Sequence, residues 1–297
     1  NHIESGILLE RGFSTDSLGH HNSIWMLRIT LMMHLVGLIG IVLLLFGTSP
    51  VDAEFERKGK DRGHEFTADV DQPQGSMRRG IRPSGLVPIF PKDVTCTTIA
   101  SPYASSTRYD GSSRPQNRFG GLHGGIDLTL DEGTPLLAIA SGKVIAAGAG
   151  GQAEGNYVWL QHAPKDTGLS FWVYSKYQHL FELPKHAIGD FLKAGDAVGL
   201  SGKTGTVGGH YGYQGYAHLH LTTLVGPSDR YEKEGSRIVA EDARMIDPIA
   251  IFAKGLTKIN DIEQLPDNQK NVGVSYVAKD GSIHPTGSRT VWPVACK

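Results

Sequence analysis

The chain has 297 residues, which is enough for one large domain or two small ones with a hydrophobic core. Its 29 lysines and arginines against 30 acidic residues give a formal net charge of −1, and no basic patch or stripe of the kind that binds nucleic acid stands out in the sequence. The 38 glycines indicate many tight turns, and therefore short strands and loops rather than long helices.

The amino-terminal part of the chain contains one long apolar segment, from Ile29 to Phe46. The segment has no polar face, which argues against a helix packed on a soluble domain, and it is about as long as a helix that crosses a bilayer. Arg28, directly before it, favours an inside amino terminus and an outside carboxyl terminus. The sequence therefore predicts that the rest of the chain is exported.

Two interpretations of residues 1–53 stay open. The small residues that end at Ala53 resemble the cleavage site of a secretory signal. The segment is therefore either a signal peptide removed near Ala53 or an uncleaved anchor that attaches the protein to the membrane through residues 29–47. Either interpretation places the protein in the periplasm or cell envelope. Residues 54–95 are polar and charged without sustained periodicity, and we expect a linker or pro-region there.

Residues 96–255 have a different sequence pattern, in which short apolar runs alternate with glycines. Runs rich in β-branched and aromatic residues predict strands over 135–140, 143–147, 156–162, 170–178 and 197–200. No window in this part supports a long amphipathic helix. We therefore expect a mainly β protein, built as a compact antiparallel β-sheet domain with long loops. Residues 256–297 are predicted to form a polar carboxyl-terminal tail without chemistry.

The two cysteines, Cys96 and Cys296, are far apart in the sequence. Without a CxxC motif they predict no thiolate zinc site. In an oxidising compartment they could pair in an intramolecular disulfide that ties the tail to the start of the main domain. The alternative, two unpaired thiols, stays open on the sequence alone.

Two histidines lie two residues apart in segment 217–223, where polar and apolar residues alternate as in a half-buried strand. Side chains two apart on a strand share a face. His218 and His220 should therefore point to one side, while Leu219 and Leu221 enter the core. Two imidazoles on one face suit a metal site or an acid–base pair, although on this feature alone a structural role is an equal alternative.

A second motif combines His123 and Asp127 around paired glycines, in the order His-Gly-Gly-Ile-Asp. The glycines argue against a helix, so we expect a loop that carries His123 and a following strand that delivers Asp127. Imidazole and carboxylate are ordinary zinc ligands. A spacing of this kind is weak by itself, because it also arises by chance.

Together the two motifs match the needs of a catalytic zinc ion, which takes three protein ligands and keeps an open position for water. His123, Asp127 and one histidine of the 218/220 pair would supply the three ligands. The remaining histidine would stay free to act on the water or the intermediate, as general base or by stabilising the oxyanion. Zinc lowers the pKa of its water towards neutrality and polarises the scissile carbonyl.

The order of these motifs along the chain is similar to that in the lysostaphin-type, LytM-like zinc metallopeptidases of family M23. The resemblance covers roughly residues 100–252, the size of one domain. Besides the two histidine motifs, it rests on Gly133-Thr134-Pro135, Ser141-Gly142-Lys143-Val144, Gly155-Asn156-Tyr157-Val158, Tyr177-Gln178-His179-Leu180, Ala194-Gly195-Asp196, Ser201-Gly202-Lys203-Thr204-Gly205 and Ile246-Asp247-Pro248.

The resemblance implies that His123, Asp127 and His220 ligate Zn²⁺, and that His179 and His218 flank the bound water as catalytic histidines. It implies a metal in a groove between loops, and an endopeptidase that hydrolyses peptide bonds in the stem peptides or cross-links of bacterial peptidoglycan. Some relatives have lost catalytic residues and act only as activators or scaffolds. The alternative is therefore a silent or latent module that binds the cell wall or activates another hydrolase.

One departure from the family pattern concerns the groove. Relatives pass quickly to the final His-x-His, whereas here residues 207–216 form a longer segment rich in glycine and tyrosine. We expect this insertion to form a loop beside the groove, and the substrate specificity that the resemblance implies therefore stays open. The stretch 164–169 is a second candidate for a groove wall.

Overall fold

The computed structural model describes residues 81–253, 255, 256, 258 and 265–297. The predicted signal or anchor, and the linker up to residue 80, lie outside the described residues. Within the described part, no helix is long and apolar enough to span a membrane.

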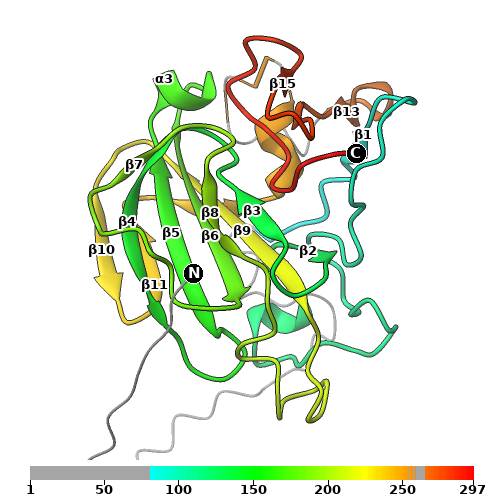
Figure 1. Cartoon of the computed structure of the whole chain (residues 1–297), viewed down its shortest axis with the longest axis vertical. Helices are drawn as coiled ribbons and strands as arrows, with labels where there is room; N and C mark the ends of the chain where they lie inside the picture. Colours follow the sequence, from blue (N-terminus) through cyan, green and yellow to red (C-terminus); the bar gives the residue numbers. More distant parts are fainter. Residues whose placement is uncertain (1–80, 254, 257, 259–264) are drawn as a thin grey trace, which may run out of the picture. The chain divides into compact units, whose positions relative to one another are not determined.

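The centre of the fold is a seven-stranded antiparallel sheet, in which β2 pairs with β9 beside the strand order β12-β9-β6-β5-β4-β7. The longer strands run side by side in Figure 1. The fold class is therefore mainly β, as predicted. The strands of this sheet are β2 (Ile126–Thr129), β4 (Gly142–Ala149), β5 (Asn156–His162), β6 (Trp172–Leu180), β7 (Phe191–Leu192), β9 (His218–Gly226) and β12 (Arg244–Ile246).

Smaller elements surround this sheet. The strand pairs are β1 (Val87–Ile89) with β13 (Asn271–Gly273), β3 (Pro135–Leu137) with β8 (Ala197–Leu200), β10 (Tyr231–Glu234) with β11 (Arg237–Ala240) and β14 (Tyr276–Val277) with β15 (Ile283–His284). The helical turns are η1 (Phe119–Gly121), α3 (Pro164–Thr167), η2 (Pro248–Phe252) and η3 (Asp267–Gln269).

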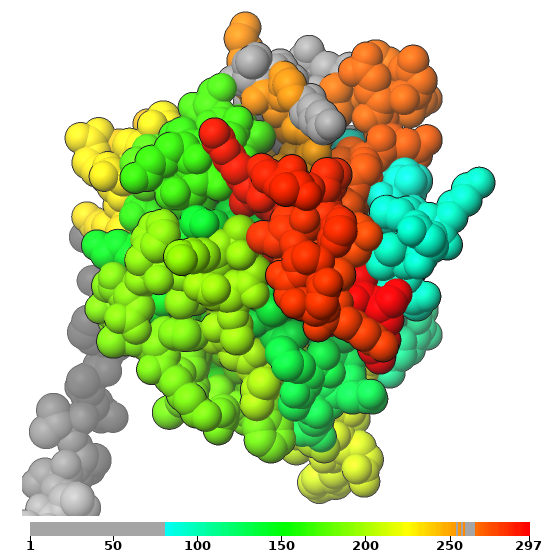
Figure 2. Space-filling view, turned by 45° about the horizontal axis from the view of Figure 1, so that its top comes forward, coloured from blue at the N-terminus to red at the C-terminus, as the bar shows by residue number. Residues whose placement is uncertain are grey.

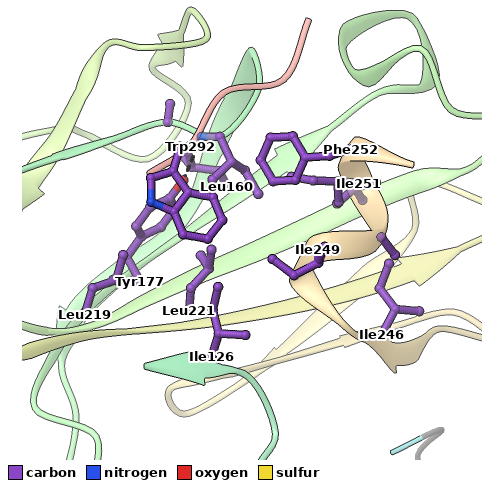
Figure 3. Close-up of a cluster of buried hydrophobic side chains, with 14 of the residues drawn as sticks. Ile126, Leu160, Tyr177, Leu219, Leu221, Ile246, Ile249, Ile251, Phe252 and Trp292 are labelled. Atoms are coloured by element: carbon purple, nitrogen blue, oxygen red, sulfur yellow. Dashed lines mark hydrogen bonds between the residues drawn. The ribbon is translucent and has the colours of Figure 1, made fainter. Parts of the chain in front are cut away.

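Both faces of the sheet are covered, which explains why its middle strands are buried almost throughout. On one face, Leu219 and Leu221 of β9 pack with Ile126 and with Ile249 of η2, and Trp292 closes the cluster (Figure 3). On the other face a second apolar cluster lies under the β10–β11 hairpin. Alternation along β9 therefore sends its leucines into the main core and leaves its histidines on the opposite side, as the sequence predicts.

The described part of the predicted polar tail belongs to this core. Trp292 is fully buried, and its indole N–H donates to the carbonyl of Thr97 at 3.0 Å. A disulfide joins Cys96 to Cys296. Figure 2 shows the last residues, in red, lying against the chain that follows residue 81, in cyan. The apolar residues of this segment are scattered among polar ones, so no periodicity in the sequence predicts that they are buried.

Candidate metal centre

The pairing of β2 with β9 brings the first two candidate ligands together. Asp127 lies directly opposite His220 in the antiparallel register, and residues paired in this way have Cβ atoms only about 5 Å apart. Their side chains meet, with Nδ1 of His220 2.8 Å from Oδ1 of Asp127. Sheet register alone therefore joins two motifs that are 93 residues apart in the sequence.

His123 reaches the same place through the glycine-rich bend before β2. A Cβ atom at Gly125 would lie 2.2 Å from the carbonyl oxygen of Leu221, so only glycine allows the chain to pass this close to β9. Nε2 of His123 lies 3.1 Å from Oδ1 of Asp127 and 3.1 Å from Nδ1 of His220. As expected from the sequence, a loop carries the histidine and a strand delivers the carboxylate.

The three side chains offer a metal-ligand set, since one ligand atom from each lies within 4.8 Å of the others. Within the described ranges, His123, Asp127 and His220 form the only group of this kind. The outward Nδ1 of His123 faces the carbonyl of Pro102 at 2.8 Å. Because a carbonyl only accepts, that nitrogen carries the proton and Nε2 presents its lone pair inward.

His220 is oriented in a similar way. Its outward Nε2 lies 3.1 Å from the hydroxyl oxygen of Thr222, which can accept a hydrogen bond, while Nδ1 faces the cluster. Such outer partners fix the tautomer and the ring orientation of metal-binding histidines. The donor set of two inward imidazole nitrogens and one carboxylate therefore fits a divalent metal ion of the zinc type.

Two further histidines stand beside this set. Nδ1 of His218 donates to the carbonyl of Tyr216 at 2.9 Å, and Nδ1 of His179 donates to the carbonyl of Thr204 at 2.8 Å. The ring centroids of the two histidines are 4.5 Å apart, and Nε2 of His218 lies 3.7 Å from Oδ1 of Asp127. Both rings therefore keep Nε2 unprotonated and available near the three ligands.

His179 is placed by an irregularity in β6. The register with β5 shifts there, because Asn156 pairs with Leu180 whereas Val158 pairs with Tyr177. Within this bulge His179 adopts a φ of 63°, a conformation that residues other than glycine rarely adopt. Bulges re-aim side chains next to active sites, and this one carries the imidazole of His179 to the side of the sheet where His218 lies.

Burial sets the charge state of these groups. It lowers the pKa of His218 to about 3 and that of His220 to about 4, and it also lowers the pKa of His179. For Asp127, burial acts to raise the pKa, but the interactions with His123 and His220 hold it well below its usual range. At neutral pH the site thus contains the Asp127 carboxylate and the neutral imidazoles of His179, His218 and His220, the forms that bind metal or accept protons.

Two supporting residues were not found from the sequence. The Arg114 guanidinium donates to Oδ2 of Asp127 at 3.4 Å and to the hydroxyl of Ser101 at 2.7 Å. The ring of Tyr216 stacks on that of His218. Arg114 lies in a polar segment without periodicity, and Tyr216 belongs to the insertion, so no local signal marks either residue.

The five histidine and aspartate side chains lie in a groove of about 890 Å³. Gly209, His210 and Tyr211 of the insertion line this groove, as expected. The stretch 164–169 does not: its residues Thr167, Gly168 and Leu169 line a separate hollow. The reason is position, because that stretch precedes β6 whereas His179 lies near the end of this strand, roughly 20 Å further along.

Comparisons with known proteins agree with this arrangement. The model of the family described as "Peptidase family M23" matches residues 121–228, which include all five predicted site residues. Lysostaphin of Staphylococcus staphylolyticus is 36% identical over 106 residues, which are 36% of this chain. The murein hydrolase activator NlpD of Salmonella dublin is 26% identical over 148 residues, which are 46% of this chain and 37% of that protein.

One solved structure, the catalytic domain of lysostaphin from Staphylococcus simulans, is 31% identical in sequence, with a TM-score of 0.31. The alignment covers 43% of this chain and 81% of that domain. The chain spans only 19% of the length of the lysostaphin sequence from Staphylococcus staphylolyticus. Since the family model spans the whole candidate site, this region of the chain belongs to peptidase family M23.

Proposed function

We propose that the protein is a zinc-dependent endopeptidase that hydrolyses peptide bonds in the stem peptides or cross-links of bacterial peptidoglycan. The observation that carries this proposal is the convergence of His123, Asp127 and His220 beside two further neutral imidazoles. Membership of family M23, whose usual substrates are such bonds, supports the choice of substrate.

Three residues would hold the metal: His123 through Nε2, His220 through Nδ1 and Asp127 through its carboxylate. Two imidazoles and one carboxylate, without a thiolate, match a catalytic zinc site with a position left for substrate or water. When bound, zinc supplies Lewis-acid chemistry, because it polarises a carbonyl group and makes a water molecule more acidic.

The chain's own part in the reaction is proton transfer by His179 and His218. Each imidazole is neutral and has Nε2 free, since Nδ1 is fixed on a backbone carbonyl. Either ring can therefore accept a proton at Nε2 from the attacking water. The imidazolium so formed can donate that proton to the leaving amine or hydrogen-bond the carbonyl oxygen as it gains charge. The nearby Asp127 carboxylate stabilises the protonated form of His218.

Digestion of purified peptidoglycan by the full chain tests this proposal. Zinc content is determined on the same samples, and the products are identified by mass. We expect new muropeptides from the wild type, none from His218→Ala with its zinc retained, and none from Asp127→Asn with its zinc lost. Intact walls after treatment with stoichiometrically zinc-loaded wild type would contradict the proposal.

The similarity to the activator NlpD motivates a second candidate, a module that stimulates a separate hydrolase. An activator does not need a complete set of ligands and catalytic histidines, whereas this chain has all five. Adding the chain to a separate wall hydrolase distinguishes the two functions. An activator would raise the rate of that hydrolase, and the His218→Ala variant of this chain would raise it by the same factor as the wild type.

We also propose that the protein acts outside the cytoplasm, in the periplasm or cell envelope, where peptidoglycan lies. The disulfide between Cys96 and Cys296 supports this, because such bonds persist in oxidising compartments. Fractionation of cells that express the full chain, followed by thiol labelling, tests the location. A cytoplasmic protein with two reactive thiols would contradict it.

A further inference from the structure

The charges that line the groove are unevenly balanced. Apart from the histidines, the lining contains four arginines and three carboxylates: Arg108, Arg114, Arg118, Arg237, Asp127, Glu154 and Glu234. Whether this excess acts on a substrate depends on which charges are already paired within the protein.

Each of the three carboxylates has a cation of the protein near it. Asp127 contacts Arg114, and Glu154 forms an ion pair of 3.0 Å with the nearly buried Lys176. Glu234 lies opposite Arg237 at the turn of the β10–β11 hairpin. Two arginines of the lining, Arg108 and Arg118, form no ion pair with these carboxylates, although the charge of Arg118 helps to lower the pKa of Glu154, after Ser236 and Lys176.

No carboxylate among the described residues lies within ion-pair distance of Arg108 or Arg118. The guanidinium of Arg108 donates to the carbonyl of Ser113 at 2.5 Å and to the hydroxyl of Ser112 at 3.3 Å. These two neutral acceptors position the group without cancelling its charge. Arg118 is exposed at the start of η1, the turn that leads to His123.

The two arginines act on different parts of the site. Arg118 lines the groove together with His179, at the start of the turn that leads to His123. Arg108 lies beside the insertion, because the Ser112 hydroxyl that accepts from Arg108 also hydrogen-bonds His210, and the neighbouring Tyr109 ring contacts that of Tyr211. A peptide in the groove would therefore meet one unpaired guanidinium near His179 and another near Tyr211.

We propose that Arg108 and Arg118 make the groove selective for acidic stem peptides, whose free carboxylates lie near the scissile bond, over amidated stems and neutral oligoglycine bridges. The inference rests on the proposed endopeptidase function. A guanidinium binds a carboxylate through two parallel charge-assisted hydrogen bonds. A carboxamide in the same place offers one acceptor oxygen and no charge, and a glycine bridge offers no side chain at all.

The experiment compares two purified cross-linked muropeptides that differ only in one group, a free carboxylate or a primary amide, next to the cleaved bond. We expect kcat/KM of the wild type to be about tenfold higher for the carboxylate form, mainly through KM, as for a charge-assisted hydrogen bond at a partly exposed site. Arg118→Gln and Arg108→Gln should each reduce this ratio, and the double variant should bring it close to one. Arg289→Gln, an exposed arginine outside the groove, is the matched control and should keep the ratio.

Two further readouts sharpen the test. Arg118→Lys keeps the charge but loses the planar guanidinium that makes two parallel hydrogen bonds. Its ratio of kcat/KM for the two muropeptides should lie between those of the wild type and Arg118→Gln. Raising the salt concentration should lower the ratio of the wild type, because exposed charges are screened. A wild-type ratio near one, or a ratio that the double variant retains, would overturn the proposal while the endopeptidase function stands.

If neither muropeptide is cleaved, the proposed function fails and binding decides the selectivity. Calorimetry with His218→Ala then measures the dissociation constants of the same two muropeptides. Tighter binding of the carboxylate form, lost in the Arg108→Gln/Arg118→Gln background, would support the selectivity. Equal binding of the two forms would overturn it.

Discussion

Tyr216 stacks on His218, with ring centroids 4.4 Å apart and ring planes inclined by 20°. The carbonyl of Tyr216 also accepts the Nδ1–H of the same imidazole, and its hydroxyl hydrogen-bonds Thr129. On its other side Tyr216 stacks against Tyr109 at 4.1 Å. The last residue of the insertion therefore holds a proposed catalytic histidine by its ring and its backbone together.

This contact predicts how substitutions of Tyr216 affect turnover. Tyr216→Leu removes the stacked ring but keeps the backbone carbonyl, so we expect kcat on a muropeptide to fall about tenfold, as for a catalytic group that loses its fixed orientation. Zinc content should stay unchanged, because Tyr216 contacts none of the three proposed ligands. Tyr216→Phe keeps the ring and serves as the control, with a kcat close to that of the wild type. A wild-type kcat in Tyr216→Leu would show that the stack does not position His218.

Arg114 gives a prediction about metal affinity. Its guanidinium donates to Oδ2 of Asp127, the oxygen turned away from His220, and thereby orients the carboxylate. Loss of such an outer partner typically weakens metal binding 10- to 100-fold, and we expect a loss of about this size in Arg114→Gln. Competition with a chromophoric chelator measures the affinity, with Arg289→Gln as control. An unchanged zinc affinity in Arg114→Gln would show that Arg114 contributes to packing and not to metal binding.

The sequence predicted those parts of the site that depend on local geometry. Alternation in segment 217–223 placed His218 and His220 on one face, and the paired glycines placed His123 in a loop before the strand of Asp127. The predicted strand 156–162 has the same bounds as β5. These features follow from side-chain periodicity and from the freedom of glycine, which both act within a few residues.

The remaining features depend on distant contacts and were not predictable in this way. The bulge that turns His179 towards His218 appears only when β6 pairs with β5. The guanidinium of Arg114 meets Asp127 because the two segments meet in space, not because of a local pattern. Trp292 is buried in a segment whose composition is polar, because the disulfide and the contact with Thr97 hold that segment against the domain.

His162 predicts a pH dependence of stability that is separate from the metal centre. Burial lowers its pKa to about 4, from an ordinary value of 6.5, and its ring is held between Ser141 and Ser175. The unfolded chain therefore binds a proton at this residue below pH 6.5, whereas the folded protein binds it only near pH 4. The stabilisation is fully present above pH 6.5 and is lost as the pH falls to 4, by about 3 kcal/mol in free energy of unfolding.

Urea denaturation at several pH values measures this effect, with zinc removed in every sample. His179, His218 and His220 change stability in the same direction, because burial lowers their pKa values too. The contribution of His162 is therefore taken as the difference between the wild type and His162→Gln. We expect a less stable variant whose stability falls less steeply between pH 6.5 and 4. Equal slopes in the two proteins would contradict the assignment.

The disulfide gives the last prediction. Cys96 and Cys296 are 200 residues apart in the sequence, and the bond closes a loop that contains the whole metal centre. Such a bond restricts the unfolded chain, and its removal typically costs about 2–4 kcal/mol in free energy of unfolding. We expect the double variant Cys96→Ser/Cys296→Ser to lose stability in this range in urea denaturation, and to match the wild type once both are reduced.

Its muropeptide cleavage at 25 °C should persist, because neither cysteine lines the groove and the sheet register that joins Asp127 to His220 does not depend on them. An unchanged midpoint under oxidising conditions would mean that the packing of Trp292 alone holds the carboxyl-terminal segment in place.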